Sequence, residues 1–253
     1  MVPKDKGTHK LASVAYHFDH NKHRNIKASN HLVLGISCLG YHYPLMFRLY
    51  LRTKQANKLK NAGNSTAIFK SKLELAIEML QAVQPIIPTE QPVTVLFDSW
   101  YASEDLLKWI TRQGWQVVCA VKGNRNLTGE QLTQWHKRHK GKRYTHVKLR
   151  LADGRFRFYR TRSHTGCVKG LSEEVRIVIS EKGKGAGRPK YFLSTDTSLS
   201  EKTILQHYQR RWSQEVDFWY VKQELGLSDY RLQNLEAIKK WHTVVYATLV
   251  MLY

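Results

Sequence analysis

The sequence is poor in acidic residues and has no long apolar run. Its 20 Asp and Glu stand against 41 Lys and Arg, which gives a net charge of +21 over 253 residues. A globular domain this basic usually binds a polyanion, and nucleic acid is the first expectation. A bilayer-spanning segment needs about 18 apolar residues in succession. The best candidate, residues 31–51, is interrupted by Gly40, His42 and Pro44, so we expect no membrane partner.

Cysteine and histidine patterns argue against a zinc protein. The three cysteines are scattered and form no CxxC pair, and the twelve histidines show no HxxxH or HExxH spacing. An odd, unpaired cysteine set fits a reducing compartment, and the residues after Met1 do not resemble a signal peptide. We therefore expect a cytoplasmic protein that works at the nucleoid.

The first half of the chain predicts strands followed by an α/β unit. Residues 11–51 predict three antiparallel strands. The polar, basic residues 52–66 predict a loop, and the apolar spacing of residues 71–83 predicts a helix. The short apolar run 93–97 predicts a buried strand. A helix closed by Gly114 and a strand at 115–122 complete a strand–helix–strand unit, for which parallel pairing is expected.

The second half changes character twice. Lys-, Arg- and Gly-rich residues with short alternating runs predict a β-rich insertion that contains a flexible basic loop. From Ser198 the pattern is helical, with a capping box to Glu201, one helix through Lys222 and a second from Asn234. Three segments are expected: a first part of the core at 1–122, an insertion at 123–195, and C-terminal core helices at 196–253.

One helix face carries an unusual set of side chains. Tyr208, Arg211, Glu215 and Lys222 stand at offsets 0, 3, 7 and 14, which places them within an arc of about 60° on a continuous helix. A solvated face with an i,i+4 ion pair is one interpretation. Trp212 and Trp219 lie beside this arc, and because tryptophan favours burial, the wall of a site is the other interpretation.

Asp98 follows the apolar run 93–97, at the edge of the sheet where α/β proteins bind ligands. Taken alone, it is equally well explained as a cap of a turn or of the helix near Ser103. Together with Glu215 it suits phosphoryl transfer, which needs carboxylates from different elements to hold two Mg²⁺ ions about 4 Å apart. Tyr208, Arg211 and Lys222 would then bind DNA phosphates.

These motifs resemble those of bacterial insertion-sequence transposases of the DDE type. FDSWY followed by Y-x2-R-x3-E-x6-K is similar to the signature of their cut-and-paste group, and the likeness extends over residues 13–222. It implies an RNase H-like α/β fold, a mixed sheet flanked by helices with a β-rich insertion between the second and third catalytic acids. It also implies Asp98 and Glu215 as those two acids and metal ligands. The expected reaction is Mg²⁺-dependent cleavage and strand transfer of double-stranded DNA, with Mn²⁺ as a substitute and a homodimer on paired ends.

The chain departs from this family at its start. The family's first catalytic Asp lies on the first strand, just before the stretch that corresponds to the opening residues here. Asp5 lies in a basic, turn-like stretch, and Asp19 lies past the following strand, so neither is expected to replace it. We expect an N-terminally truncated core that is inactive or nearly so. The alternatives are a non-catalytic DNA-binding remnant and another RNase H-like nuclease, and the helix-face motif argues against the second.

The hairpin at residues 146–158 is a second candidate DNA contact. Its apolar residues are expected on one face, and these are Val147, Leu149, Leu151, Phe156 and Phe158. Its four cations are expected on the other face, where they contact either solvent or DNA; they are Lys148, Arg150, Arg155 and Arg157.

Overall fold

The chain folds as a mixed α/β protein in two compact units. A computed structural model describes residues 1–4, 11–19, 22–139, 141, 143–151, 154–182 and 186–252. Unit 1 consists of Met1–Ile87 with Ser213–Tyr253, and unit 2 consists of Pro88–Trp212. Asp5 and Asp153, the latter at the predicted hairpin turn, lie outside the described residues.

Unit 1 contains a four-stranded antiparallel sheet. β3 is its central strand and pairs with β1, β2 and β4, which confirms the predicted three-stranded meander. β3 begins at Arg24, inside a polar stretch that precedes the predicted apolar run. Pairing with β2 explains this earlier start, because it satisfies the backbone of Arg24–Ser29. The strands are β1 (Val2–Pro3), β2 (Val14–Asp19), β3 (Arg24–Cys38) and β4 (Tyr41–Tyr50).

The helices of unit 1 include one that the sequence analysis missed. The predicted loop at 52–66 is wrong over most of its length, because α1 forms there. The Gln55 side chain caps α1 at Arg52 and donates to the Val14 carbonyl, and Ala56 is buried. None of the helices in the described residues has both the length and the apolar character needed to cross a bilayer. The elements are α1 (Thr53–Asn61), α2 (Lys72–Val83), the 3₁₀ turn η1 (Gln84–Ile86), α6 (Trp212–Gln223) and α7 (Leu235–Met251).

Unit 2 contains a six-stranded mixed sheet in the order β5-β6-β12-β11-β10-β9. β5 and β6 are parallel, with α3 between them in sequence, so the predicted strand–helix–strand unit is confirmed. β12 joins β6 antiparallel, which places strands from the predicted core and the predicted insertion in one sheet. The predicted segment boundaries stay predictions. The strands are β5 (Thr94–Phe97), β6 (Gln116–Val121), β9 (Thr145–Arg150), β10 (Phe156–Gly166), β11 (Val175–Lys182) and β12 (Ala186–Ser194).

The flexible basic loop that the sequence predicts corresponds to residues 182–190. Within the described residues, these form the end of β11 and the start of β12, and residues 183–185 lie outside the described part.

The remaining elements of unit 2 are short. Helix α5 is capped by Ser200, whose side chain accepts from Thr203 N–H, and not by Ser198 as predicted. These elements are α3 (Glu104–Arg112), β7 (Asn126–Leu127), β8 (Glu130–Gln131), α4 (Leu132–Arg138) and α5 (Glu201–Arg210).

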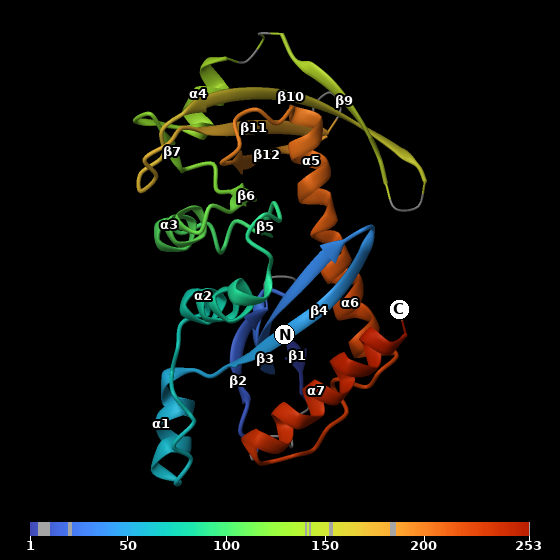
Figure 1. The fold of residues 1–253 in the computed structure, drawn as a ribbon. Helices are drawn as coiled ribbons and strands as arrows, with labels where there is room; N and C mark the ends of the chain where they lie inside the picture. The colour runs from blue at the N-terminus through green and yellow to red at the C-terminus, as the bar shows by residue number, and fades with distance from the viewer. Residues whose placement is uncertain are drawn as a thin grey trace. The chain divides into compact units, whose positions relative to one another are not determined.

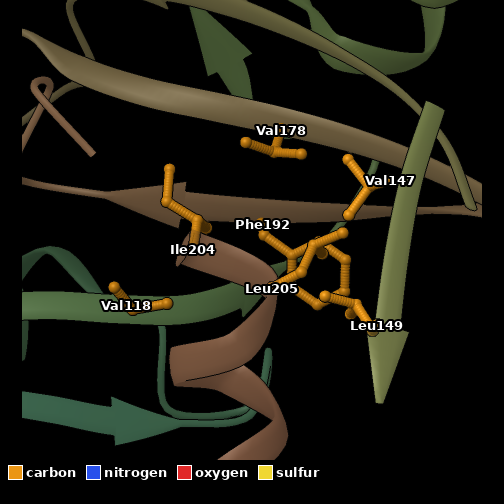
Figure 2. Close-up of a cluster of buried hydrophobic side chains, with 7 residues drawn as sticks. All are labelled: Val118, Val147, Leu149, Val178, Phe192, Ile204 and Leu205. Carbon is orange, nitrogen blue, oxygen red and sulfur yellow. The ribbon is translucent and has the colours of Figure 1, made fainter. Parts of the chain in front are cut away.

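The core of unit 2 lies between α5 and the sheet. Figure 1 shows α5 on one face of the sheet and α4 on the other. Ile204 and Leu205 of α5 point into the side chains of four strands, as Figure 2 shows. The buried cluster consists of Val118, Val147, Leu149, Val178, Phe192, Ile204 and Leu205.

Unit 1 buries three histidines, His17, His31 and His242. The His31 and His242 rings lie 5.2 Å apart, and His31 Nε2 lies 2.8 Å from the Tyr246 hydroxyl. Burial lowers the pKa of His17 and of His242 to about 4 and that of His31 well below its ordinary value. The folded chain therefore keeps these imidazoles neutral at pH 7.

Acidification should destabilise the protein before its carboxylates titrate. The unfolded chain takes up protons on these histidines near pH 6.5, whereas the folded chain does not, so their contribution is complete above pH 6.5 and is lost as the pH falls toward about 4. Each pKa unit of difference is worth about 1.4 kcal/mol per histidine. Urea titrations at several pH values between 7 and 4.5 measure how steeply the free energy of unfolding falls with pH. His242→Phe should make this pH dependence shallower. An unchanged pH dependence would contradict the view that the folded chain keeps His242 neutral.

Candidate functional site

Asp98 follows the last residue of β5, at the carboxyl end of a parallel strand pair. Its Oδ1 accepts a hydrogen bond from Trp100 N–H at 2.8 Å, and its backbone carbonyl accepts from Tyr101 N–H at 3.2 Å. Burial, and then the charge of Asp98, raise the pKa of Tyr101. The helix that follows is capped by Ser103. Asp98 therefore caps the turn and not α3, and the turn fixes the direction of its carboxylate.

Tyr208 and Arg211 belong to the same unit as Asp98. Tyr208 packs its ring against Phe192, with the ring centroids 4.8 Å apart, and the Arg211 guanidinium lies 5.3 Å from the Tyr208 ring centroid. Burial raises the pKa of Tyr208, the charge and hydrogen bond of Arg211 oppose this rise, and the charge of Asp98 adds a smaller contribution to it. The phenol is thus a neutral hydrogen-bonding group within the electrostatic reach of the Asp98 carboxylate.

The predicted single helix through Lys222 is interrupted at Arg211. α5 ends at Arg210, and Arg211 N–H donates to the Tyr208 carbonyl in a tighter turn before α6 starts. Tyr208 and Arg211 belong to unit 2, whereas Glu215 and Lys222 belong to unit 1. The four residues are therefore divided between α5 with its C-cap and α6.

The two tryptophans of α6 are not buried, although their expected burial was the reason to interpret this helix face as the wall of a site. Trp212 is 57% exposed and Trp219 is 55% exposed. Lys222 is different, because its side chain is half-buried and burial lowers its pKa. Its ammonium lies 5.5 Å from the Phe218 ring centroid. The stem of Lys222 thus packs within unit 1, and Glu215 is half-buried on the same helix.

Helix α6 is held to the β3–β4 hairpin by a buried carboxylate. Asp217 is fully buried, and its Oδ2 lies 3.2 Å from His42 Nε2. The opposite ring nitrogen of His42 lies 2.8 Å from the Ser37 hydroxyl. Asp217 and Glu215 lie about 200° apart around the helix, so the contact that anchors α6 points Glu215 away from the hairpin.

Gly35 lets α6 approach β3 closely. A Cβ at this position would lie 2.7 Å from His42 Cε1 and 2.8 Å from Gln214 Oε1. Any larger residue would displace either His42 or the side chain next to Glu215. Sequence reasoning missed Ser37, His42 and Asp217, and the one available signal was an acidic residue on the face of the helix opposite to Glu215.

The hairpin of β9 and β10 presents a different face from the predicted one. Directly paired residues share a face of a sheet, and the register pairs Phe156 with Arg150 and Phe158 with Lys148. Both phenylalanines therefore lie on the face of these two cations, where they are exposed, and the predicted apolar face is wrong for them. Val147 and Leu149 are buried on the other face, as predicted.

The remaining two cations of this hairpin lie apart from that pair. Arg157 is paired with Leu149, so it lies on the α5 side of the hairpin but is exposed. Arg155 lies at the turn, where its carbonyl accepts from Leu151 N–H. The structure therefore brings together Lys148 and Arg150, with Arg155 and Arg157 at the margin.

The candidate metal-binding carboxylates are distributed over both units. Asp98 is in unit 2, while Glu215 and Asp19 are in unit 1. Asp19 ends β2, where its Oδ1 accepts from Lys22 N–H at 3.3 Å. Across the residues that the structure describes, His, Cys, Asp and Glu side chains form no group of three or more suited to a metal ion.

The chain matches a known protein family over most of its length. A family model described as Transposase DDE domain matches residues 70–251, which include both Asp98 and Glu215. The chain belongs to this transposase family. No curated protein matches it significantly. The match covers α2 of unit 1, all of unit 2, and the helices α6 and α7.

Breaking the anchor of α6 should destabilise this transposase. Asp217→Ala removes the carboxylate that faces the His42 ring, and leaving a largely buried polar group without its partner costs about 1–3 kcal/mol. Urea unfolding measures the free-energy change. Glu224→Ala, an exposed residue just beyond α6, is the control and should change stability by less than about 0.5 kcal/mol.

A double-mutant cycle separates this contact from general packing loss. His42→Ala combined with Asp217→Ala should cost less than the sum of the two single changes, because the pair is removed together. Strict additivity would show that His42 and Asp217 do not stabilise one another.

Proposed function

We propose that this transposase cleaves DNA at the ends of an insertion sequence and joins those ends to target DNA, with Asp98 and Glu215 as two of its metal-binding carboxylates. The observation that carries the proposal is the placement of Asp98. It stands at the carboxyl end of a parallel strand, oriented by a turn, in a chain whose family match extends to Glu215. An RNase H-like core with residues 123–195 as its insertion remains part of the proposal.

The donor chemistry at Asp98 suits Mg²⁺. Carboxylate oxygens are the ligands that this ion prefers, and one oxygen of Asp98 is already oriented by Trp100 N–H. Asp98 and Glu215 would hold the ions, with Mn²⁺ as a substitute. When bound, the metal would supply positive charge that stabilises the attacking and leaving oxygens of the phosphate.

The chain's own cations would bind and orient the DNA. Arg211 can form two parallel hydrogen bonds to a phosphate, and its position beside Tyr208 places such a contact in the same unit as Asp98. Lys222 offers one ammonium on α6. On the hairpin, Lys148 and Arg150 share an exposed face, and Arg155 and Arg157 extend the positive charge around the turn.

The third carboxylate of the catalytic set is not assigned among the described residues. The expectation that the 253 residues are inactive or nearly so in strand cleavage stays a prediction. So does the homodimer on paired DNA ends. A nicking assay on the 253 residues tests the first expectation. Efficient cutting by the 253 residues that Asp19→Asn abolishes would identify Asp19 as the missing ligand.

Metal binding should depend on both assigned acids. Asp98→Asn and Glu215→Gln should each weaken Mn²⁺ binding in the presence of an end duplex, by at least on the order of tenfold, the usual cost of losing even an outer-shell partner. The electron paramagnetic resonance signal of free Mn²⁺ measures binding without requiring turnover. DNA affinity should be retained in both variants.

Glu78→Gln is the matched control for metal binding. Glu78 is paired with Arg48 at 2.9 Å and with Lys70, so its loss should not change Mn²⁺ affinity. If Asp98→Asn and Glu215→Gln behave like this control, the chain is a non-catalytic DNA-binding protein.

DNA binding should be strongly salt-dependent. Each cation that neutralises a phosphate releases counterions and adds about 0.9 to the slope of log K against log salt. Lys148→Glu and Arg150→Glu should each flatten this slope by about 1 for duplex DNA, measured by fluorescence anisotropy. Lys239→Glu is the control, because Lys239 is paired with Glu236 at 2.7 Å. Equal slopes for all variants would remove the hairpin from the DNA interface.

A further inference from the structure

Two phenylalanines are exposed side by side at the end of the β9–β10 hairpin. Phe156 is 54% exposed and Phe158 is 62% exposed. They alternate along β10 and therefore lie on one face of the strand. The described pairing of β10 with β11 begins at Tyr159, so within the described residues Phe156 and Phe158 have β9 as their paired strand. Figure 1 shows this hairpin extending beyond the neighbouring strands.

Packing of unit 2 does not account for these rings. The opposite face of the hairpin carries Val147 and Leu149, which are buried against α5. Helix α4 packs on the same face as Phe156 and Phe158 but farther along the sheet, where Trp135 stacks on His164 with the ring centroids 5.0 Å apart. The face is thus covered at one end and open at the phenylalanine end.

A cation lies over both rings. Lys148 Nζ lies 4.0 Å from the Phe156 ring centroid and 5.7 Å from that of Phe158. Arg150 is paired directly with Phe156. Residues 143–162 contain one acidic residue, Asp153, and seven basic residues: Arg143, Lys148, Arg150, Arg155, Arg157, Arg160 and Arg162. Aromatic rings among cations match a ligand that has both flat rings and negative charge.

We propose that the β9–β10 hairpin binds single-stranded DNA, with unpaired bases stacked on Phe156 and Phe158 and phosphates at Lys148 and Arg150. This inference rests on the proposed function, which requires DNA as the substrate, and it identifies the state of the DNA that this surface recognises. Aromatic side chains interleaved with cations are the usual platform for single strands.

The spacing of the rings favours a single strand over a duplex. Residues i and i+2 of a strand lie about 6.8 Å apart, which is twice the rise of about 3.4 Å per nucleotide in a stacked duplex. Bases within a duplex are already stacked on their neighbours and have no face free for a side chain. Successive bases reach both rings only when they are separated from each other.

Trp135, a tryptophan in the predicted insertion, is less suited to stacking on a base. Its ring is stacked on His139, at 4.2 Å between centroids, as well as on His164. Among the described residues, the group that lies over the phenylalanine pair is the Lys148 ammonium, which a phosphate attracts away from the rings more readily than a stacked ring is displaced.

The test compares single-stranded with duplex DNA. Anisotropy titrations use a labelled 12-nucleotide oligo(dT) and a 12-base-pair duplex, each with the full chain. Phe156→Ala and Phe158→Ala should each weaken oligo(dT) binding by on the order of tenfold, with duplex binding changed less than twofold. The salt slope for oligo(dT) should be unchanged, because stacking releases no counterions. Phe156→Trp should retain the affinity, whereas Phe156→Leu should not.

Phe18→Ala is the matched control. Phe18 is a 47% exposed phenylalanine on β2 of unit 1, and its loss should leave oligo(dT) binding unchanged. Circular dichroism and urea unfolding confirm that each variant is folded. Because the readout is binding in the absence of metal, it is independent of the catalytic assignment of Asp98 and Glu215.

Three results would overturn the inference. One is unchanged oligo(dT) affinity in a folded Phe156→Ala/Phe158→Ala double variant. Another is an equal loss for oligo(dT) and duplex, which would make the face a general DNA contact. The third is a concentration-dependent dimer, seen by light scattering, that the double variant abolishes without any change in oligo(dT) binding. That result would assign the face to a second copy of the chain.

Discussion

The packing of α5 against the six-stranded sheet organises the basic half of this transposase. Ile204 and Leu205 fill the space between strands that come from distant parts of the sequence, including β6 and β9. Truncating a buried leucine such as Leu205 typically costs about 2–5 kcal/mol. The same helix carries Tyr208, and Gln209 donates to the Arg150 carbonyl of the hairpin at 3.0 Å. The apolar packing of α5 on the sheet thus positions both the Tyr208 phenol and the cationic β9–β10 hairpin.

The residues of the Y-x2-R-x3-E-x6-K pattern are held in place by two different sets of contacts. Tyr208 and Arg211 depend on the core of unit 2, whereas Glu215 depends on α6, which is fixed to the β3–β4 hairpin through Asp217 and His42. Because Asp217 is fully buried and faces His42, this contact fixes which side of α6 lies against the hairpin. The fixed spacing between Arg211 and Glu215 therefore spans a junction between two separately stabilised parts of the chain. The predicted motif thus takes two of its residues from each unit.

Strong local patterns were enough to predict much of the fold. The apolar run before Asp98, the glycine at 114 and the next apolar run specified a parallel strand–helix–strand unit, because turn chemistry and periodicity agree there. α1 was missed because Ala56 is its only buried residue, which leaves almost no apolar periodicity to detect. Which residues of β9 and β10 share a face depends on the register between the two strands. A register shifted by one residue from the predicted one places Phe156 and Phe158 on the face of Lys148 and Arg150. The contact of Asp217 with His42 joins residues far apart in the sequence, so no local pattern reveals it.

The central claim is that Asp98 and Glu215 act on the same metal ions although they belong to different units. A crystal structure of the chain with an end duplex and Mn²⁺ tests it most directly, because anomalous scattering locates the ions. We predict that the two carboxylates lie within about 10 Å of each other, next to ions about 4 Å apart. Carboxylates that face away from each other on the DNA-bound chain, or Mn²⁺ bound at neither, would contradict it.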